Sequence, residues 1–264
     1  MLRVWVVAVF GSLLLGSPSA LAHQNHQRYH RAIIDPLETH HAIIEDEFTW
    51  NFRHEEDPED GESAQQYELE LAWAFADLFG VEVFVPVVHF DPRETTAASG
   101  IGDIELDIKL WSFVHPSSKF VVTPQANLIL PTGERDRNFG KSSTVLEPAL
   151  LADLVLGEHV ALQANLEYGV SLDKDRRAND LGYAVSLAYS FFLGPQGSFS
   201  PLLELVGETI ASGPKRGENA VTLLPGFKWS WGGWHAGVGY QFPLTNRREF
   251  EWALLSQVGY HLSW

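Results

Sequence analysis

Histidines gather near the start of the chain. Five of them fall within 19 residues, at His23, His26, His30, His40 and His41. Imidazole nitrogens are common metal ligands, and spacings of three and four residues would bring the rings together on a helix. The sequence therefore raises a metal-binding hypothesis for this segment. The alternative is a flexible, solvated tail, since neither a cysteine nor a fixed carboxylate spacing accompanies the histidines.

Carboxylates form a second group of chemically active side chains. They recur at alternate positions between apolar residues, which places them on one face of β-strands. If that face lines a barrel lumen, the carboxylates create a negative potential that concentrates cations. The alternative is a sealed lumen, in which they pair with the fewer bases on the same face, Lys109, Lys228, Arg53, His235 and His261. The acidic set is Glu45, Glu47, Glu68, Glu70, Glu105, Asp107, Glu147, Glu167 and Glu204, with Glu82 as a further inward-facing residue.

Catalytic motifs are absent from the sequence. It contains no Gly-x-Ser-x-Gly, no His-Glu-x-x-His and no phosphate-binding loop. A lipase-like rim site could be assembled from His89 and Ser142–Ser143, but nothing marks a third, orienting group. We expect no enzymatic activity and no cofactor.

Composition narrows the class of partner. The 34 Asp and Glu residues outnumber the 18 Lys and Arg residues, so nucleic acid is not expected, because phosphate binding requires a basic surface. The chain has no cysteine, which excludes disulfides and thiolate metal sites and suits an oxidising compartment.

The first residues have the pattern of an export signal. A basic start is followed by an apolar run from Val4 to Leu15, and Ala20-x-Ala22 supplies the small residues that a signal peptidase needs. The run is too short for a membrane anchor, which takes roughly 20 residues. We expect residues 1–22 to be removed, so that the mature chain begins at His23.

Strands must position the remaining side chains, because period-2 alternation recurs from Ile43 to the end of the chain and helix signals are nearly absent. Most predicted strands have about 10 to 12 residues, close to the 9–11 that cross a bilayer when tilted. Longer and shorter connections alternate between them, as in outer-membrane barrels. The predicted strands are 43–53, 64–75, 81–90, 104–113, 120–130, 144–155, 160–170, 181–192, 200–210, 220–229, 234–242 and 251–264.

The last strand has a pattern of its own. Val258, Tyr260, Leu262 and Trp264 alternate and end on an aromatic residue. This resembles the C-terminal signature that the barrel assembly machinery recognises in outer-membrane proteins. That machinery, outer-membrane lipid and lipopolysaccharide are the expected partners, and aromatic residues near strand ends suit the membrane interfaces.

Two rim motifs suggest a family. Gly100, Gly102 and Asp103 lead directly into the strand that begins at Ile104, and Pro131, Thr132 and Gly133 follow a later strand. Glycines permit tight turns, and proline ends strand pairing. The two motifs, with their spacing, resemble those of an outer-membrane transporter family named after a phenol-degradation pathway. This resemblance covers about residues 45–264 and implies a channel for small, often hydrophobic, molecules.

These observations predict an all-β protein, a closed up-and-down antiparallel transmembrane β-barrel of about 12 strands, in the outer membrane of a Gram-negative bacterium. Residues 42–264 would form the barrel, and residues 23–41 a His-rich periplasmic segment. The expected function is a channel or transporter for small molecules, either hydrophobic compounds or cations. The alternative is a non-conducting structural or metal-related accessory barrel with a periplasmic His-rich tail.

Overall fold

A computed structural model gives the fold of the chain. It describes residues 29–57, 62–75, 79–91, 96–115, 117, 119–134, 139–140, 143–172, 179–248 and 250–262. The signal sequence, His23, His26, Ser142 and Trp264 lie outside these residues. Among the described residues, no helix is long and apolar enough to cross a bilayer.

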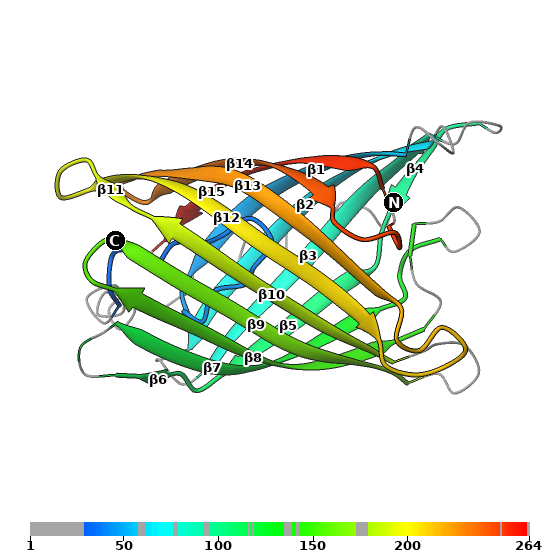
Figure 1. Cartoon of the computed structure of the whole chain (residues 1–264), viewed down its shortest axis with the longest axis horizontal. Helices are drawn as coiled ribbons and strands as arrows, with labels where there is room; N and C mark the ends of the chain where they lie inside the picture. The colour runs from blue at the N-terminus through cyan, green and yellow to red at the C-terminus, as the bar shows by residue number, and fades with distance from the viewer. Residues whose placement is uncertain are drawn as a thin grey trace, which may run out of the picture.

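Twelve long strands close into a barrel in the described part of the chain (Figure 1). Sequence neighbours pair antiparallel all the way round, and β1 pairs with β15 to close the ring. This confirms the predicted fold class and strand number. The long strands are β1 (Glu47–Asp57), β2 (Glu62–Phe75), β3 (Phe79–Asp91), β5 (Ile104–Leu110), β7 (Phe120–Leu130), β8 (Val145–Leu156), β9 (Val160–Ser171), β10 (Asp180–Tyr189), β12 (Gly197–Ile210), β13 (Asn219–Trp231), β14 (Trp234–Pro243) and β15 (Trp252–His261).

The two ends of the barrel differ in their connections. Residues 92–103, 131–144, 172–179, 211–218 and 244–251 connect strands at one end, which we call the loop end. The other, the turn end, has connections as short as residues 232–233 and holds the end of β15 (Figure 1). Three short strands add to the ends: β4 (Ala98–Ile101), β6 (Phe113–Val114) and β11 (Phe191–Phe192). The first loop-end connection, residues 58–61, is shorter than the predicted 54–63, because β1 and β2 continue past the expected ends.

Strand faces separate lipid from lumen. In β7, β8 and β12, buried and more exposed positions alternate along the strand. Large apolar side chains such as Leu150, Leu203 and Val258 lie exposed on the outer face, whereas Asp107, Gln163 and Glu204 are fully buried. This is the arrangement of a transmembrane barrel, whose lipid-facing and lumen-facing residues alternate.

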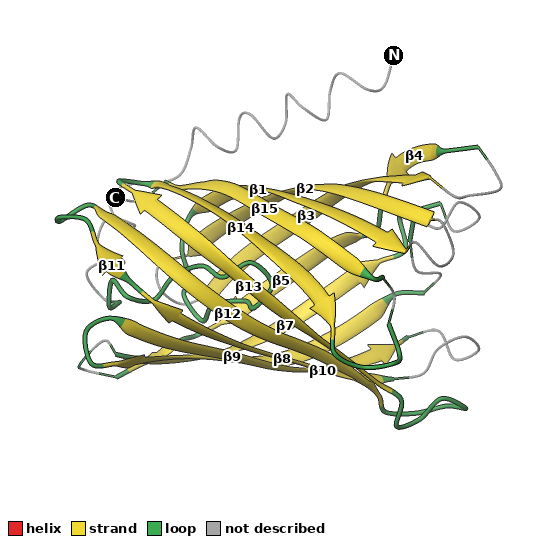
Figure 2. Cartoon of the chain, turned by 45° about the horizontal axis from the view of Figure 1, so that its top comes forward, coloured by secondary structure: helices red, strands yellow, loops and turns green. Residues whose placement is uncertain are grey.

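The chain ahead of β1 runs inside the barrel. Residues 29–46, called the inner segment below, form the interior loop in Figure 2. Ala32, Ala42 and Ile44 in this segment are almost completely buried. The predicted first strand, 43–53, is therefore wrong at its start: β1 begins at Glu47, and residues 43–46 still belong to the lumen. Ile44 is buried against the barrel wall, and the Asp46 carbonyl accepts a hydrogen bond from the Leu262 N–H at 2.8 Å, so the period-2 pattern continues just ahead of β1.

Candidate functional site

The inner segment is held in the lumen by buried carboxylates. Glu204 in β12 accepts hydrogen bonds from three consecutive backbone N–H groups, those of Leu37 (2.7 Å), Glu38 (3.1 Å) and Thr39 (2.7 Å). Asp153 in β8 accepts one from the Ala42 N–H at 2.9 Å. Buried backbone polar groups need hydrogen-bond partners. These carboxylates replace the hydrogen bonds to water that the N–H groups of the irregular segment lose on burial.

Side-chain donors from other strands bind the segment's carbonyl groups. Lys109 Nζ donates to the Ile43 carbonyl at 3.1 Å, and Gln163 Nε2 donates to the Ile34 carbonyl at 2.8 Å. Thr123 Oγ1 donates to the Ala42 carbonyl at 2.5 Å. Lys109, Gln163 and Thr123 lie near the turn-end limits of their strands. The inner segment therefore occupies the turn-end half of the lumen.

Glycines in the barrel wall make room for a leucine of this segment. A Cβ atom at Gly226, Gly237 or Gly239 would lie only 2.7–2.9 Å from a methyl carbon of Leu37. Because side chains there would collide with Leu37, these glycines of β13 and β14 form a socket for it. The sequence predicted that residues 23–41 form a periplasmic segment. The structure corrects this from Ala32 onward, where the segment is buried in the lumen, whereas His30 and Arg31 contact Glu158 and Phe192 at the turn end.

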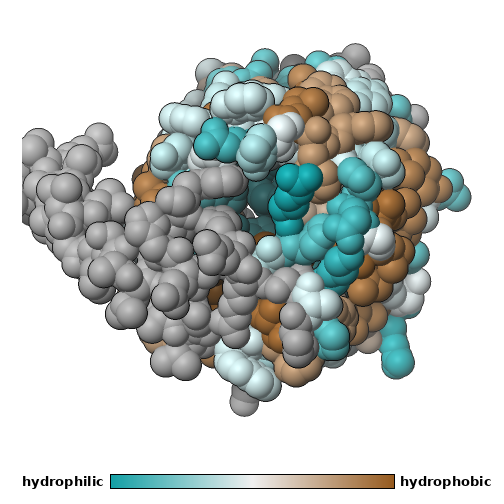
Figure 3. Space-filling model, turned by 90° about the vertical axis from the view of Figure 1, so that its left-hand side faces the viewer, coloured by the Kyte–Doolittle hydropathy of each residue, from teal (hydrophilic) through white to brown (hydrophobic). Residues whose placement is uncertain are grey.

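A cavity of about 650 Å³ lies on the loop-end side of the inner segment, and we call it the vestibule. Asp35 to His41 of the inner segment form its floor, and Glu208 and Arg247 lie near its loop-end limit. Eleven carboxylates and four Lys or Arg side chains line it. At the opposite, turn end, Figure 3 shows a narrow hollow bordered by hydrophilic residues, with hydrophobic residues on the flank of the barrel.

Ion pairs balance part of the lumen charge. Lys109 Nζ lies 2.7 Å from Glu82 Oε1, and both side chains are buried. Arg53 Nη1 lies 2.5 Å from Glu38 Oε1 at the vestibule floor, and Arg247 Nη2 lies 2.9 Å from Glu208 Oε1 above it. The carboxylates still outnumber the cationic side chains, so the vestibule carries a negative potential.

Two groups of the inner segment have strongly shifted pKa values. Burial would raise the pKa of Asp35, but the Lys228 ammonium at 3.0 Å, and then His235 and His41, hold it below its ordinary value. Burial and then Lys109 lower the pKa of His41 to about 4, although Glu45, Asp35 and Glu82 act in the opposite direction. At neutral pH the segment therefore presents an ionised Asp35 and a neutral His41.

The structure separates the sequence-predicted carboxylates into two levels. Glu68, Glu70, Glu82, Glu105, Glu147 and Glu167 line the vestibule. Glu45 belongs to the inner segment itself, and Glu47, Asp107 and Glu204 are buried around that segment. Of the predicted bases, Lys228 pairs with Asp35 of that segment, while His261 lies between Glu45 and Glu47. Sequence reasoning missed Asp153, Gln163 and the glycine socket, because their partners lie far away along the chain.

The predicted histidine cluster does not form among the described residues. His30 lies 3.3 Å from Glu158 at the turn end. His40 packs edge-on against Phe84 with 6.1 Å between ring centroids, and His41 lies 3.5 Å from Glu45. The segment is not helical, so its spacing does not bring these rings together; His23 and His26 lie outside the described residues.

The two rim motifs contact each other at the loop end. Thr132 Oγ1 accepts a hydrogen bond from the Ile104 N–H at 2.8 Å and donates one to the Gly102 carbonyl at 2.9 Å. Asp103 Oδ1 accepts one from the Gly133 N–H at 2.9 Å. The ring of the buried Phe139 fills the space that a side chain at Gly100 would need. Both motifs, with Pro131 directly after β7, thus fasten two neighbouring loops together.

The other candidate residues lie apart from the vestibule. Val258 and Leu262 are exposed on the outer surface, and Tyr260 packs against Trp234 with 4.9 Å between ring centroids. His89 Nδ1 and Ser99 Oγ are 2.7 Å apart, whereas Ser143 accepts a hydrogen bond from Ser171. His89 and Ser143 therefore have separate partners; Ser142 lies outside the described residues.

The pattern of one protein family matches residues 59–257, and its description reads "Putative MetA-pathway of phenol degradation". The chain belongs to this family. This confirms the resemblance inferred from the rim motifs. The matched region begins after the inner segment and β1, so the inner segment lies outside it. No curated protein matches the chain.

Solved structures share the architecture. An outer membrane channel from Pseudomonas putida F1 superposes with a TM-score of 0.60 at 15% identity, over 86% of this chain and 99% of that one. The NanC porin gives 0.52 at 8% identity, over 83% and 100% of the two chains. LpxR from Salmonella typhimurium gives 0.50 at 6%, over 82% and 100%. The chain shares the fold of these outer-membrane β-barrels.

Proposed function

We propose that this protein is an outer-membrane channel whose vestibule selects small cations or cationic solutes. The observation that carries the proposal is the charge of the vestibule wall, where eleven carboxylates face four Lys or Arg side chains. A low-dielectric barrel wall focuses such a field and raises the local concentration of cations. The loop end corresponds to the cell exterior in outer-membrane barrels, so the vestibule would open toward the medium.

The polar lining favours charged solutes over the hydrophobic molecules that the family resemblance implied. Glu68, Glu105 and Glu167 come from three different strands and all line the vestibule. An apolar solute would have to displace water from these carboxylates without replacing their hydrogen bonds, which costs free energy. Cationic solutes would instead gain from the same groups.

Passage to the periplasm requires the inner segment to move aside. Its hydrogen bonds to Glu204 and Asp153 hold it across the turn-end half of the lumen. This observation also supports the second candidate function, a sealed structural barrel. In a channel the inner segment leaves its position while the barrel stays folded, and in a sealed structural barrel it does not.

Planar-bilayer recording of the purified full-length chain tests the proposal. We expect brief conducting events in the wild type, and longer or more frequent ones in Glu204→Gln, which weakens the attachment of the inner segment. Glu208→Gln, four residues farther along β12, serves as the control, because Glu208 pairs with Arg247 and not with the segment. If no variant conducts, although heat-modifiable mobility on gels shows that the barrels are folded, the sealed structural barrel is favoured.

A further inference from the structure

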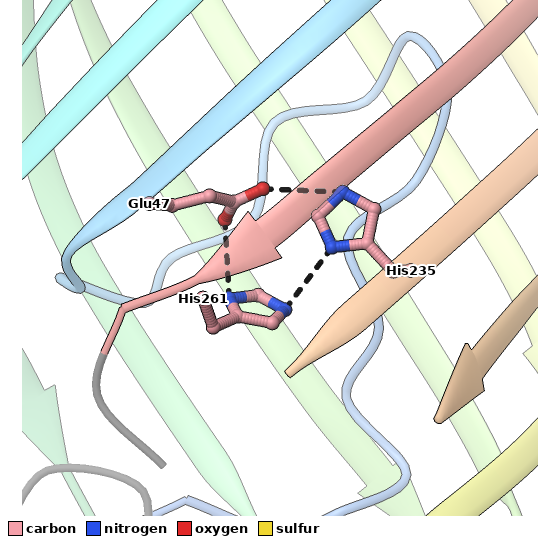
Figure 4. A group of neighbouring side chains, drawn as sticks. All are labelled: Glu47, His235 and His261. Atoms are coloured by element: carbon pink, nitrogen blue, oxygen red, sulfur yellow. Dashed lines mark hydrogen bonds and ion pairs between the residues drawn. The ribbon is translucent and has the colours of Figure 1, made fainter. Parts of the chain in front are cut away.

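A compact group of imidazoles and carboxylates lies at the turn end, below the vestibule. Glu47 is at the start of β1, His235 at the start of β14 and His261 at the end of β15 (Figure 4). These strands are neighbours, and Glu47 and His261 are directly opposed in the β1–β15 pair. The inner segment adds His41 and Glu45 to the same group.

Leaving His235 aside, two of the three shortest distances in this group match the separation of ligands around one metal ion, and the third is slightly shorter. His261 Nδ1 lies 3.0 Å from Glu45 Oε2 and 3.3 Å from Glu47 Oε2. His41 Nε2 lies 3.5 Å from Glu45 Oε1. Nitrogen and oxygen ligands at about 2.0–2.2 Å in a tetrahedron are separated by about 3.3–3.6 Å. The ligand atoms of His41, Glu45 and Glu47 lie within 4.8 Å of one another, and His261 contacts both carboxylates. Side-chain movements that bring these four groups around one ion would complete a four-ligand site.

His235 is placed to support such a site from outside. Its Nδ1 and His261 Nε2 are 3.2 Å apart, and its Nε2 lies 3.2 Å from Glu47 Oε1. A proton on His261 Nε2 leaves His261 Nδ1 available as a metal ligand, and a small rotation of the His235 ring would direct a proton on its Nε2 at the Glu47 carboxylate. Metal-binding imidazoles commonly have such hydrogen-bonded partners, which fix the tautomer. Thr49 Oγ1 also donates to Glu47.

Two independent observations indicate that this group has room for a bound cation. His235 is only 2% exposed, and its Nε2 is buried without a hydrogen bond that meets geometric criteria. Glu45 and Glu47 are both buried, while the nearby Lys228 is directed to Asp35 and Gln257. Two buried carboxylates need a cation close by, either an imidazolium at His261 or a bound metal.

We propose that His41, Glu45, Glu47 and His261 bind one divalent transition-metal ion, with His235 as the positioning residue. A mixed imidazole and carboxylate set of this size suits Zn²⁺ and related ions. His41 and Glu45 belong to the inner segment, whereas Glu47 and His261 belong to the wall. The metal would therefore fasten the segment to the barrel.

Titration of the chelator-treated full-length protein with Co²⁺, followed by Zn²⁺ displacement, tests this site. Tetrahedral Co²⁺ absorbs visible light far more strongly than hydrated Co²⁺. We expect one intense equivalent per chain, lost in His261→Gln and weakened about 10- to 100-fold in His235→Gln, as for other supporting residues of metal sites. His115→Gln is the matched control, because His115 lies at an exposed turn and contacts Ser117.

Two further variants keep the test decisive. Glu45 lies outside the strands, so Glu45→Gln should leave the barrel closed. A loss of Co²⁺ binding in this variant could then be attributed to the missing carboxylate. His23→Gln/His26→Gln tests binding by the histidines ahead of the inner segment. An absence of tetrahedral absorption in the folded wild type, or equal binding in wild type and His261→Gln, would overturn the proposal and leave an imidazolium ion pair.

Discussion

Replacing Glu204 by glutamine should release the inner segment from the barrel wall. The Glu204 carboxylate accepts three backbone hydrogen bonds, at 2.7, 3.1 and 2.7 Å, and two of them, from Glu38 and Thr39, reach the same oxygen, Oε2. An amide can keep one oxygen as acceptor, but its NH₂ group must then face N–H donors. Hydrogen bonds to a charged group contribute about 1.5–3 kcal/mol each, and a buried donor without a partner costs about 1–3 kcal/mol.

We therefore expect Glu204→Gln to destabilise the docked segment by about 2–4 kcal/mol, which raises the undocked fraction about 30- to 700-fold. Amide hydrogen exchange of Leu37 to Thr39, measured by mass spectrometry on the detergent-solubilised protein, should accelerate by a similar factor. Glu208→Gln, the same chemical change on the same strand, should leave these amides protected. Unchanged protection in Glu204→Gln, or equal loss in both variants, would refute the proposed role of this carboxylate.

Three further perturbations have expected outcomes. Gly239→Val should also accelerate exchange in the inner segment, because a Cβ there lies 2.7 Å from Leu37 Cδ1; normal protection would contradict the socket. Leu71→Arg places a charge on the lipid face and should lower the free energy of unfolding by about 2–4 kcal/mol if residue 71 lies near mid-bilayer. Urea titration in lipid vesicles measures this change, and Glu70→Gln in the lumen should have a smaller effect. Reversed sensitivities would mean that the lipid-facing and lumen-facing sides of β2 are exchanged. In chelator-treated, metal-free protein, lowering the pH from about 6.5 to about 4 should loosen the segment. The pKa of His41 is about 4 when docked and about 6.5 when released, so protons favour the released state. His41→Gln should flatten that dependence in exchange rates corrected for intrinsic chemistry, and an unchanged slope would count against it.

Much of the barrel could be predicted from the sequence because strand periodicity is a local property. Alternation within ten or so residues identifies each strand and which side chains share a face, so Glu68 and Glu105 could be assigned to the lumen without knowing their neighbours. Export and C-terminal signals added the membrane context. The sequence also exposes the rim motifs, although their mutual hydrogen bonds, such as Asp103 to Gly133, needed the structure.

The inner segment could not be predicted, because it has no period and its partners are distant along the chain. Glu204 contacts residues 165 to 167 positions away, and Lys109 contacts one 66 positions away. Histidines and charges made residues 23–41 resemble a solvated tail. One signal did point the other way: the apolar groups Ala32–Ile34 and Ala42–Ile44 would be out of place in a solvated tail, and both are buried in the structure.

The reversal potential in asymmetric KCl tests the central claim, that vestibule carboxylates determine which ions pass. Recording Glu204→Gln alone and combined with Glu68→Gln, Glu105→Gln and Glu167→Gln isolates their contribution. We expect a reversal potential of the sign that cation selectivity produces, smaller at high salt because the Debye length falls from about 10 Å at 0.1 M to about 3 Å at 1 M. The combined variant should show a clearly smaller reversal potential than Glu204→Gln alone, because it removes three of the eleven vestibule carboxylates. An anion-selective current, or cation selectivity that is unchanged when Glu68, Glu105 and Glu167 are neutralised, would contradict the account.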